Sequence, residues 1–345
     1  MVSIKKEGVL LKKTNLSFEN KGVLNPAVLR DGDFVHLYYR AINEANESTI
    51  GYCRLKGPLM IEERLQIPLI VPQFEYESIG VEDPRIVKID DLVYLTYTAY
   101  DGINALGALA VAKDYLHFEK FGLITPQISY DDFFKITAAN KTINEKYYRY
   151  NINERVNRKE GKNTYLWDKN LLFFPRKINN KFYFLHRIRP DIQIVSVDTI
   201  QDLTYDFWQN YLLHLEEHIV LKPKYEHEIS YIGGGCPPIE TSAGWLLIYH
   251  GVQDSIQGYI YSACAALLDI DNPKKEISRL EHVLFKPEKI WKTSAELNEN
   301  RVCFPTGTAL FDDILYIYYG DDDEEISCAS LPLNELVNEL IQHRI

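Results

Sequence analysis

The sequence predicts an all-β protein, in which one five-bladed β-propeller domain spans residues 1–345 and ends in a short helix. The first observation behind this prediction is a repeat. A proline, a short apolar strand, a polar turn and an aromatic strand recur at residues 25–40, 82–101, 174–187, 236–251 and 304–320. The second is the content of 24 Tyr, 15 Phe and 4 Trp, because flat rings pack well on the pleated surface of strands. The third is that helical periodicity is rare along the chain.

Each copy of the repeat predicts a β-hairpin, because two apolar or alternating runs flank Asn, Asp or Gly turn residues. Repeated hairpins of this kind are typical of propeller blades, which close around a central channel and leave few exposed strand edges. The chain between the second and third copies is longer, and we interpret its polar segment at about 131–169 as an insertion. A β-sandwich is the competing interpretation of the repeat.

One helix is expected at the C-terminal end. Residues 331–341 carry apolar side chains at three- and four-residue spacing, which predicts a short amphipathic helix. We expect its apolar face to cover the propeller. A subunit contact, and with it a homo-oligomer, is the alternative.

Charge and cysteine content limit the partners and the compartment. A net charge of −11 argues against binding to nucleic acid or to an anionic membrane, since both select basic surfaces. The sequence has no run of ~20 apolar residues that would span a bilayer, and its first residues do not resemble a signal peptide. Five widely spaced cysteines predict reduced thiols rather than a disulfide framework. We therefore expect a cytoplasmic protein.

Polar residues recur at the ends of the predicted hairpins, where the blades of a propeller approach its axis. The second strands end in or near Arg40, Tyr100, Asp101, Arg187, His250 and Asp323, and the opening segments add Asn25, Asp83 and Arg85. No nucleophile elbow, phosphate-binding glycine loop or metal-ligand motif accompanies them, so the sequence predicts neither a metal nor a cofactor. Carboxylates together with Arg and His suit sugar recognition and acid-assisted cleavage of a glycosidic bond.

The motifs in combination resemble glycoside hydrolase family 130. They include Glu82-Asp83-Pro84-Arg85, Tyr100-Asp101-Gly102, Leu185-His186-Arg187, Gly233-Gly234-Gly235-Cys236-Pro237 and Phe304-Pro305-Thr306-Gly307. The resemblance covers nearly the whole chain. It implies a five-bladed propeller and an enzyme that acts on β-mannosides, since the family holds inverting β-mannoside phosphorylases and some β-1,2-mannosidases.

The resemblance also implies roles for single residues. Asp101 corresponds to the catalytic acid, whose proton is passed to the glycosidic oxygen through a hydroxyl of the bound mannose. The residues expected to bind the sugar are Asn25, Arg40, Asp83, Arg85, Tyr100 and Asp323. In the phosphate pocket, Arg187 and His250 match two family positions, and Lys169 falls where the first arginine of the family would be.

Tyr231 departs from the family pattern, because phosphorylases commonly carry a lysine at this place in the phosphate pocket. Loss of one cation weakens an anion site, since a charge-assisted hydrogen bond contributes roughly 1.5–3 kcal/mol. Glu228 lies just upstream, where a carboxylate would repel phosphate and activate water instead.

Three functions follow from these motifs. The leading hypothesis is an inverting β-mannoside phosphorylase, which uses inorganic phosphate as co-substrate and a small oligosaccharide as substrate. The second is an inverting β-mannosidase with Glu228 as base, and the third is a non-catalytic sugar-binding propeller. The sequence does not determine which linkage is cleaved or which sugar is attached to the mannose.

Overall fold

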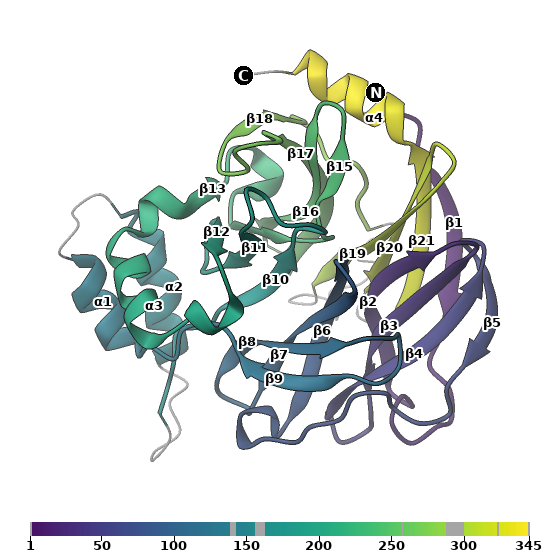
Figure 1. The fold of residues 1–345 in the computed structure, drawn as a ribbon, viewed down its shortest axis with the longest axis horizontal. Helices are drawn as coiled ribbons and strands as arrows, with labels where there is room; N and C mark the ends of the chain where they lie inside the picture. The colour runs from purple at the N-terminus through teal and green to yellow at the C-terminus, as the bar shows by residue number, and fades with distance from the viewer. Residues whose placement is uncertain are drawn as a thin grey trace.

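The computed structural model describes residues 2–138, 143–155, 163–256, 258–287, 300–322 and 324–343. The chain is mostly β-sheet, as predicted, and its strands follow one another around the molecule (Figure 1). None of its helices in these ranges is long and apolar enough to cross a membrane.

Antiparallel pairing groups the strands into five sets within the described residues. The first set is β2 (Gly22–Asp31), β3 (Phe34–Ile42), β4 (Ser48–Lys56) and β5 (Met60–Arg64). The second is β6 (Gly80–Ile89), β7 (Leu92–Tyr100), β8 (Ala105–Ala112) and β9 (Glu119–Leu123). The third is β10 (Lys169–Phe173), β11 (Phe182–Arg187), β12 (Ile192–Val197) and β13 (Ile219–Leu221).

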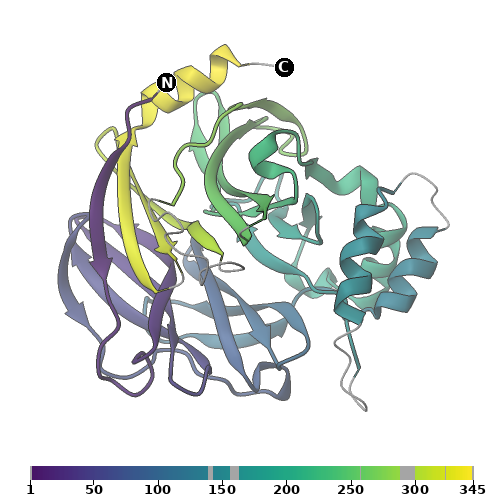
Figure 2. The ribbon, with the colours of Figure 1, turned by 180° about the vertical axis from the view of Figure 1, so that it is seen from behind.

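The last two sets belong to one nine-stranded sheet. The fourth is β14 (Tyr231–Gly234), β15 (Ile239–Thr241), β16 (Gly244–Ser255), β17 (Gly258–Leu268) and β18 (Glu276–Arg279). The fifth is β19 (Arg301–Phe311), β20 (Ile314–Asp321), β21 (Glu325–Pro332) and, from the other end of the chain, β1 (Lys5–Leu11). The N-terminal strand therefore lies beside the C-terminal one (Figure 2).

A hydrophobic cluster lies between each set and the next. One cluster joins the first and second sets through Tyr38, Ile50 and Leu95, and others continue around the described chain. The last returns to the start, because Ala309 and Tyr318 of the fifth set pack with Leu37 of the first. Packing that is continuous in this way removes apolar surface on both faces of every set.

The helices are more numerous than expected. The C-terminal helix is confirmed as α4 (Leu333–Gln342), whose buried face joins the core of the fourth and fifth sets. The segment interpreted as an insertion forms α1 (Tyr130–Ala138) and α2 (Lys146–Arg155), which pack beside α3 (Tyr205–Leu213) on one side of the molecule (Figure 1). The short helices η1 (Glu75–Glu77), η2 (Ile200–Asp202), η3 (Leu215–His218) and η4 (Glu226–Glu228) lie in connections.

The opening strands of the first three sets share one bulge. Asn25, Asp83 and Asn170 have φ of +52°, +50° and +58°, and the pairing register shifts at each of them. The third copy of the repeat therefore opens at Asn170, not at Phe174-Pro175 as predicted. Leu171 stands where the other two copies have proline, so the sequence pattern is hidden there.

A layer of buried ring–carboxylate pairs lies next to these bulges. In the first set the Tyr39 hydroxyl donates to Glu19, which also pairs with Arg64 at 2.9 Å. The second set repeats the arrangement with Tyr97, Glu77 and Lys120. The fourth repeats it with Tyr249, Glu228 and Arg279. In the third, His186 and Asp168 take the same places, with nitrogen and oxygen 2.7 Å apart. Pairing of this kind offsets the cost of burying each carboxylate.

Candidate active site

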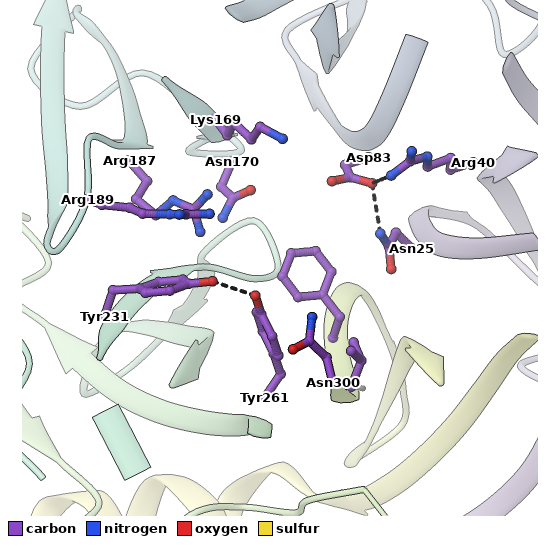
Figure 3. A pocket seen from close by; sticks show the side chains of 12 residues that line it. Asn25, Arg40, Asp83, Lys169, Asn170, Arg187, Arg189, Tyr231, Tyr261 and Asn300 are labelled. Atoms are coloured by element: carbon purple, nitrogen blue, oxygen red, sulfur yellow. Dashed lines mark hydrogen bonds and ion pairs between the residues drawn. The ribbon is translucent and has the colours of Figure 1, made fainter. Parts of the chain in front are cut away.

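One pocket collects half of the predicted site residues (Figure 3). All five strand sets contribute to its lining: Asn25, Arg40, Asp83, Lys169, Asn170, Arg187, Arg189, Tyr231, Tyr261, Asn300, Val302 and Phe304. Asp83 and Asn25 lie on one side of the pocket (Figure 3). Lys169, Arg187 and Arg189 lie on the other. The pocket thus has a half that suits hydroxyl groups and a half that suits an anion.

The first half is built on two of the bulges. Asn25 and Asp83 adopt positive φ, which Asn and Asp tolerate better than other side chains, and the bulge turns both into the pocket. Asn25 Nδ2 donates to Asp83 Oδ1 at 2.8 Å, and Arg40 Nη1 lies 3.4 Å from the same oxygen. Gly320 is required beside them, because a Cβ there would lie 2.2 Å from Asn25 Oδ1.

The charge of Asp83 is held in place by its neighbours. Burial by itself would raise the pKa of Asp83, but Arg40, then Lys169 and the hydrogen bond from Asn25, outweigh it and hold the pKa below its usual range. Arg40 is fixed in turn by Glu82, 2.7 Å from Nη2, and by Ser48 Oγ, 2.9 Å from Nε. Asp83 is therefore an ionised acceptor, suited to the hydroxyls of a sugar.

The second half gathers three cations. Lys169 opens β10, Arg187 ends β11, and Arg189 follows two residues later. The guanidinium groups of Arg187 and Arg189 lie 5.3 and 4.4 Å from the centroid of the Tyr231 ring. Burial lowers the pKa of Lys169, the carboxylates of Glu82 and Asp83 raise it, and the two arginines lower it further. These cations are close enough to act on one another.

His250 lies buried behind this half. Burial, followed by the charges of Arg187, Arg85 and Arg189, holds the pKa of His250 well below its usual value. The ring of His250 is therefore neutral and offers one N–H donor and one acceptor. Gly233 permits its position, because a Cβ there would lie 2.5 Å from the imidazole.

Several buried polar atoms around the pocket have no hydrogen-bond partner within the described residues. They are Asn25 Oδ1, Arg85 Nη2, Asn170 Nδ2 and both ring nitrogens of His250. Buried polar groups in folded proteins are nearly always satisfied, so such a concentration indicates a place where ligand or solvent completes the bonding.

Arg85 is buried and lies outside the lining of the pocket among the described residues. Its Nη1 donates to the carbonyl oxygens of Asp83 and Pro84 at 3.0 and 2.9 Å, and its Nε donates to Gly235 O. Arg85 thus ties the second set to the fourth and supports the bulge at Asp83. Burial lowers its pKa to about 10, which leaves it charged at neutral pH.

Asp101 lies beside the pocket, outside the side chains that line it among the described residues. It follows β7 and is half-buried. Its Oδ1 accepts hydrogen bonds from the main-chain nitrogens of Ile103 and Asn104 at 2.8 and 2.6 Å, and its Oδ2 accepts from Asn104 Nδ2 at 3.0 Å. Tyr100 packs edge-on to Trp167, and the Trp167 ring lies under Lys169. Asp101 is therefore anchored next to the cationic half.

Glu228 is built into the ring–carboxylate layer and does not line the pocket. Its side chain is fully buried. Oε1 accepts from the Tyr249 hydroxyl, while Oε2 accepts from Arg279 Nη1 at 3.1 Å and from Lys224 N at 2.7 Å. Glu77 has the same local structure, since it also ends a short helix and accepts from the main-chain nitrogen four residues earlier. The prediction that Glu228 faces the site as a base does not fit this arrangement.

Asp323 lies outside the described residues. A group of potential metal ligands, His227, Glu228 and Cys264, lies near the same layer. Arg279 already neutralises Glu228, and burial raises the pKa of the Cys264 thiol well above its usual value. This donor set therefore does not suit a metal ion.

Sequence reasoning missed half of the lining. The missed residues are Arg189, Asn170, Tyr261, Asn300, Val302 and Phe304. Asn170 was hidden because the third copy lacks its proline, and Tyr261 lies in β17, whose residues the repeat did not use. Arg189 carried a usable signal, because it stands two residues after Arg187 at the end of the same hairpin.

Comparison with known proteins places this chain among carbohydrate-active enzymes. It belongs to glycoside hydrolase family 130, whose sequence profile, described as β-1,4-mannooligosaccharide phosphorylase, matches residues 9–342. The 1,2-β-oligomannan phosphorylase of Thermoanaerobacter sp. (strain X514) is 30% identical over 341 residues, which are 95% of this chain and 96% of the relative. The β-1,2-mannobiose phosphorylase of the same organism is 31% identical over 326 residues, 90% of each chain.

A solved structure shares the fold. The β-1,2-mannobiose phosphorylase from Listeria innocua, in complex with β-1,2-mannobiose, superimposes with a TM-score of 0.71 at 21% identity. The similarity covers 98% of this chain and 99% of that chain.

The ion pair of Arg40 with Asp83 predicts a pH-dependent contribution to stability. Because the pKa of Asp83 is lowered, the pair stabilises the fold above the usual Asp range, and this contribution is lost as the pH falls through the lowered pKa. Arg40→Gln should lower the free energy of unfolding by about 1–3 kcal/mol at pH 7. The difference from wild type should shrink at about pH 3, in urea titrations at both pH values.

Arg54→Gln is the matched control, since Arg54 pairs with Glu62 and Glu63 at the surface. Its effect should stay below about 1 kcal/mol at both pH values. If Arg40→Gln lowers the free energy of unfolding by the same amount at both pH values, Asp83 and Arg40 do not form the ionised pair described here.

Proposed function

We propose that the five strand sets are the blades of a five-bladed β-propeller, formed by one domain over residues 1–345 with the segment at about 131–169 as an insertion. The continuous series of clusters between sets, which returns from the fifth to the first, supports this arrangement. The pocket then lies at one mouth of the central channel, where the bulged openings of the blades meet.

We further propose that the protein is an inverting β-mannoside phosphorylase, which cleaves a short β-linked mannoside with inorganic phosphate and yields α-mannose 1-phosphate. The observation that carries the proposal is one pocket in which Asn25 and Asp83 face Lys169 and Arg187. The relatives from Thermoanaerobacter, named as phosphorylases of β-1,2-linked mannosides, support this substrate class.

The proposed reaction is a single displacement. A phosphate oxygen forms a bond to C1 of the mannose while the bond from C1 to the leaving sugar breaks. Attack from the face opposite the leaving group converts the β-anomer to the α-anomer. The leaving oxygen takes the proton of Asp101, and the proton carried by the attacking hydrogen phosphate restores Asp101. The products are therefore a free sugar and mannose 1-phosphate, with atoms and charge in balance.

The protein's residues divide the work. Asn25, Arg40 and Asp83 bind the mannose hydroxyls, with Asp323 as a proposed fourth contact. Lys169 and Arg187 hold phosphate in line with C1, which turns a reaction of two solutes into one within a complex. The neutral ring of His250 and the hydroxyl of Tyr231 donate hydrogen bonds to it.

Asp101 is the proposed proton donor. Within the described residues its Oδ2 accepts one hydrogen bond and its Oδ1 accepts two, so Oδ2 is the oxygen better able to carry the proton. Asp101 lies beside the pocket, and the resemblance to family 130 implies that its proton passes through a hydroxyl of the bound mannose. Tyr100 borders this route, where burial raises its pKa and keeps its hydroxyl neutral.

Hydrolysis is the second candidate, since Tyr231 stands where phosphorylases commonly carry lysine. It requires a base that can reach a water molecule on the far side of the sugar. Glu228 has both oxygens engaged in a buried network, which favours phosphate as the nucleophile.

We also propose a cytoplasmic location. All five cysteines are free and buried, which suits a reducing compartment.

Product analysis tests the reaction. With β-1,2-mannobiose, wild-type protein should release mannose 1-phosphate in the presence of inorganic phosphate and form no free mannose at a comparable rate in its absence. Asp101→Asn should reduce turnover by about 10²–10⁴-fold, the usual contribution of a general acid. Release of mannose at the same rate with and without phosphate would establish a hydrolase. Unchanged turnover in Asp101→Asn would refute the assignment of Asp101 as the proton donor, and no product from wild-type protein would favour a sugar-binding propeller without catalysis.

A pair of variants tests whether Glu228 has only a structural role. Glu228→Gln and the matched control Glu77→Gln should each lower the free energy of unfolding by about 3 kcal/mol, since each leaves a buried cation without its carboxylate. Below the melting temperature of both variants, turnover should stay within about threefold of wild type. If Glu228→Gln loses turnover by a hundredfold or more while Glu77→Gln keeps it, Glu228 is a base and the structural assignment fails.

A further inference from the structure

We infer that Arg189 is an anion-binding residue of this pocket. From a neighbouring position it replaces the lysine that phosphorylases commonly carry where this chain has Tyr231. The inference rests on the proposed function, because it names the residue that completes the phosphate site. Arg189 was assigned no role by the sequence motifs.

The geometry of Arg189 is set by an aromatic ring. Its guanidinium carbon lies 4.4 Å from the centroid of Tyr231, and Tyr231 is 1% exposed. Arg187 lies over the same ring at 5.3 Å, and both arginines line the pocket together with Lys169 (Figure 3). A guanidinium held by its face against a ring keeps its N–H groups at the edge, where they can form the paired bonds that phosphate accepts.

The electrostatics indicate a site for an anion. Arg187 and Arg189 both contribute to the lowered pKa of Lys169 and of His250, after burial as the largest cause. Like charges at this range destabilise one another, and a bound dianion relieves that repulsion. The cluster therefore favours inorganic phosphate over water or a neutral sugar hydroxyl.

The exchange of lysine for tyrosine is compensated within the pocket. A lysine at 231 would stand against Arg187 and Arg189 and add to their repulsion. Tyr231 instead supports both guanidinium groups, and its hydroxyl is hydrogen-bonded to that of Tyr261. Burial and Tyr231 raise the pKa of Tyr261, so Tyr261 keeps its proton. One proton bridges the two oxygens, and the other is available to phosphate.

The helical segment at about 131–169 supports this arrangement. Tyr150 of α2 donates its hydroxyl to Ser230 O at 2.6 Å and packs edge-on against Tyr231, with ring centroids 5.9 Å apart. The guanidinium carbon of Arg189 lies 6.0 Å from the Tyr150 ring. Tyr150 is therefore a positioning residue, which confines Arg189 between two rings.

The test is direct binding of inorganic phosphate, measured by titration calorimetry on the full-length protein. Arg189→Gln should weaken binding by about tenfold to a hundredfold, the effect of losing one charged donor. Arg176→Gln is the matched control, since Arg176 also stacks on a ring, Trp245 at 4.9 Å, and lies outside the pocket. The affinity of Arg176→Gln for phosphate should equal that of wild type.

Kinetics then separate this inference from the proposed function. In Arg189→Gln the KM for phosphate should rise by the same factor, while the KM for β-1,2-mannobiose at saturating phosphate changes less than about twofold. Restoring a lysine in Arg189→Gln/Tyr231→Lys should recover most of the lost phosphate affinity.

Two results overturn the assignment of Arg189: phosphate affinity that Arg189→Gln leaves unchanged, or an equal rise of both KM values. If Arg189→Gln does not fold, Arg189→Lys answers the question, because loss of the paired donors should still weaken phosphate binding. A wild-type protein that binds phosphate through Arg189 but releases no mannose 1-phosphate would refute the proposed reaction and keep the anion site.

Discussion

The bulges at Asn25, Asp83 and Asn170 determine what the pocket can be. At each of them the backbone takes a positive φ and the strand register shifts, so a side chain that would otherwise lie in the sheet turns into the pocket. Asn and Asp accept this conformation at a lower cost than other residues with a Cβ, and they also supply the hydrogen-bonding groups. The residue required by the backbone is thus also the residue required by the ligand.

The layer beneath the bulges explains why some charged residues belong to the fold and not to the reaction. Tyr39, Tyr97 and Tyr249 each bind a buried glutamate that is neutralised by an arginine or a lysine from the same strand set. These groups hold neighbouring segments together without access to the pocket. Glu228 belongs to this layer, and its likeness to Glu77 is visible only when the two short helices are compared.

The sequence predicted the mostly β fold and six residues of the pocket lining: Asn25, Arg40, Asp83, Lys169, Arg187 and Tyr231. The repeat located Asn25, Arg40, Asp83 and Arg187, because it places equivalent residues at equivalent ends of strands. Lys169 and Tyr231 followed from the resemblance to family 130. The sequence pattern misplaced the third copy, since Leu171 stands where proline marks the others. It also missed α1, α2 and α3, whose segments lack a long apolar periodicity.

The two halves of the pocket now have separate physical meanings. Asp83, kept ionised by Arg40, suits hydroxyl donors, whereas Lys169, Arg187 and Arg189 suit a dianion. The most direct test is a crystal structure of the protein with inorganic phosphate and mannose bound together. We predict phosphate in contact with Lys169, Arg187 and Arg189, and mannose in contact with Asn25 and Asp83. Phosphate bound elsewhere, or mannose occupying the cationic half, would contradict the account.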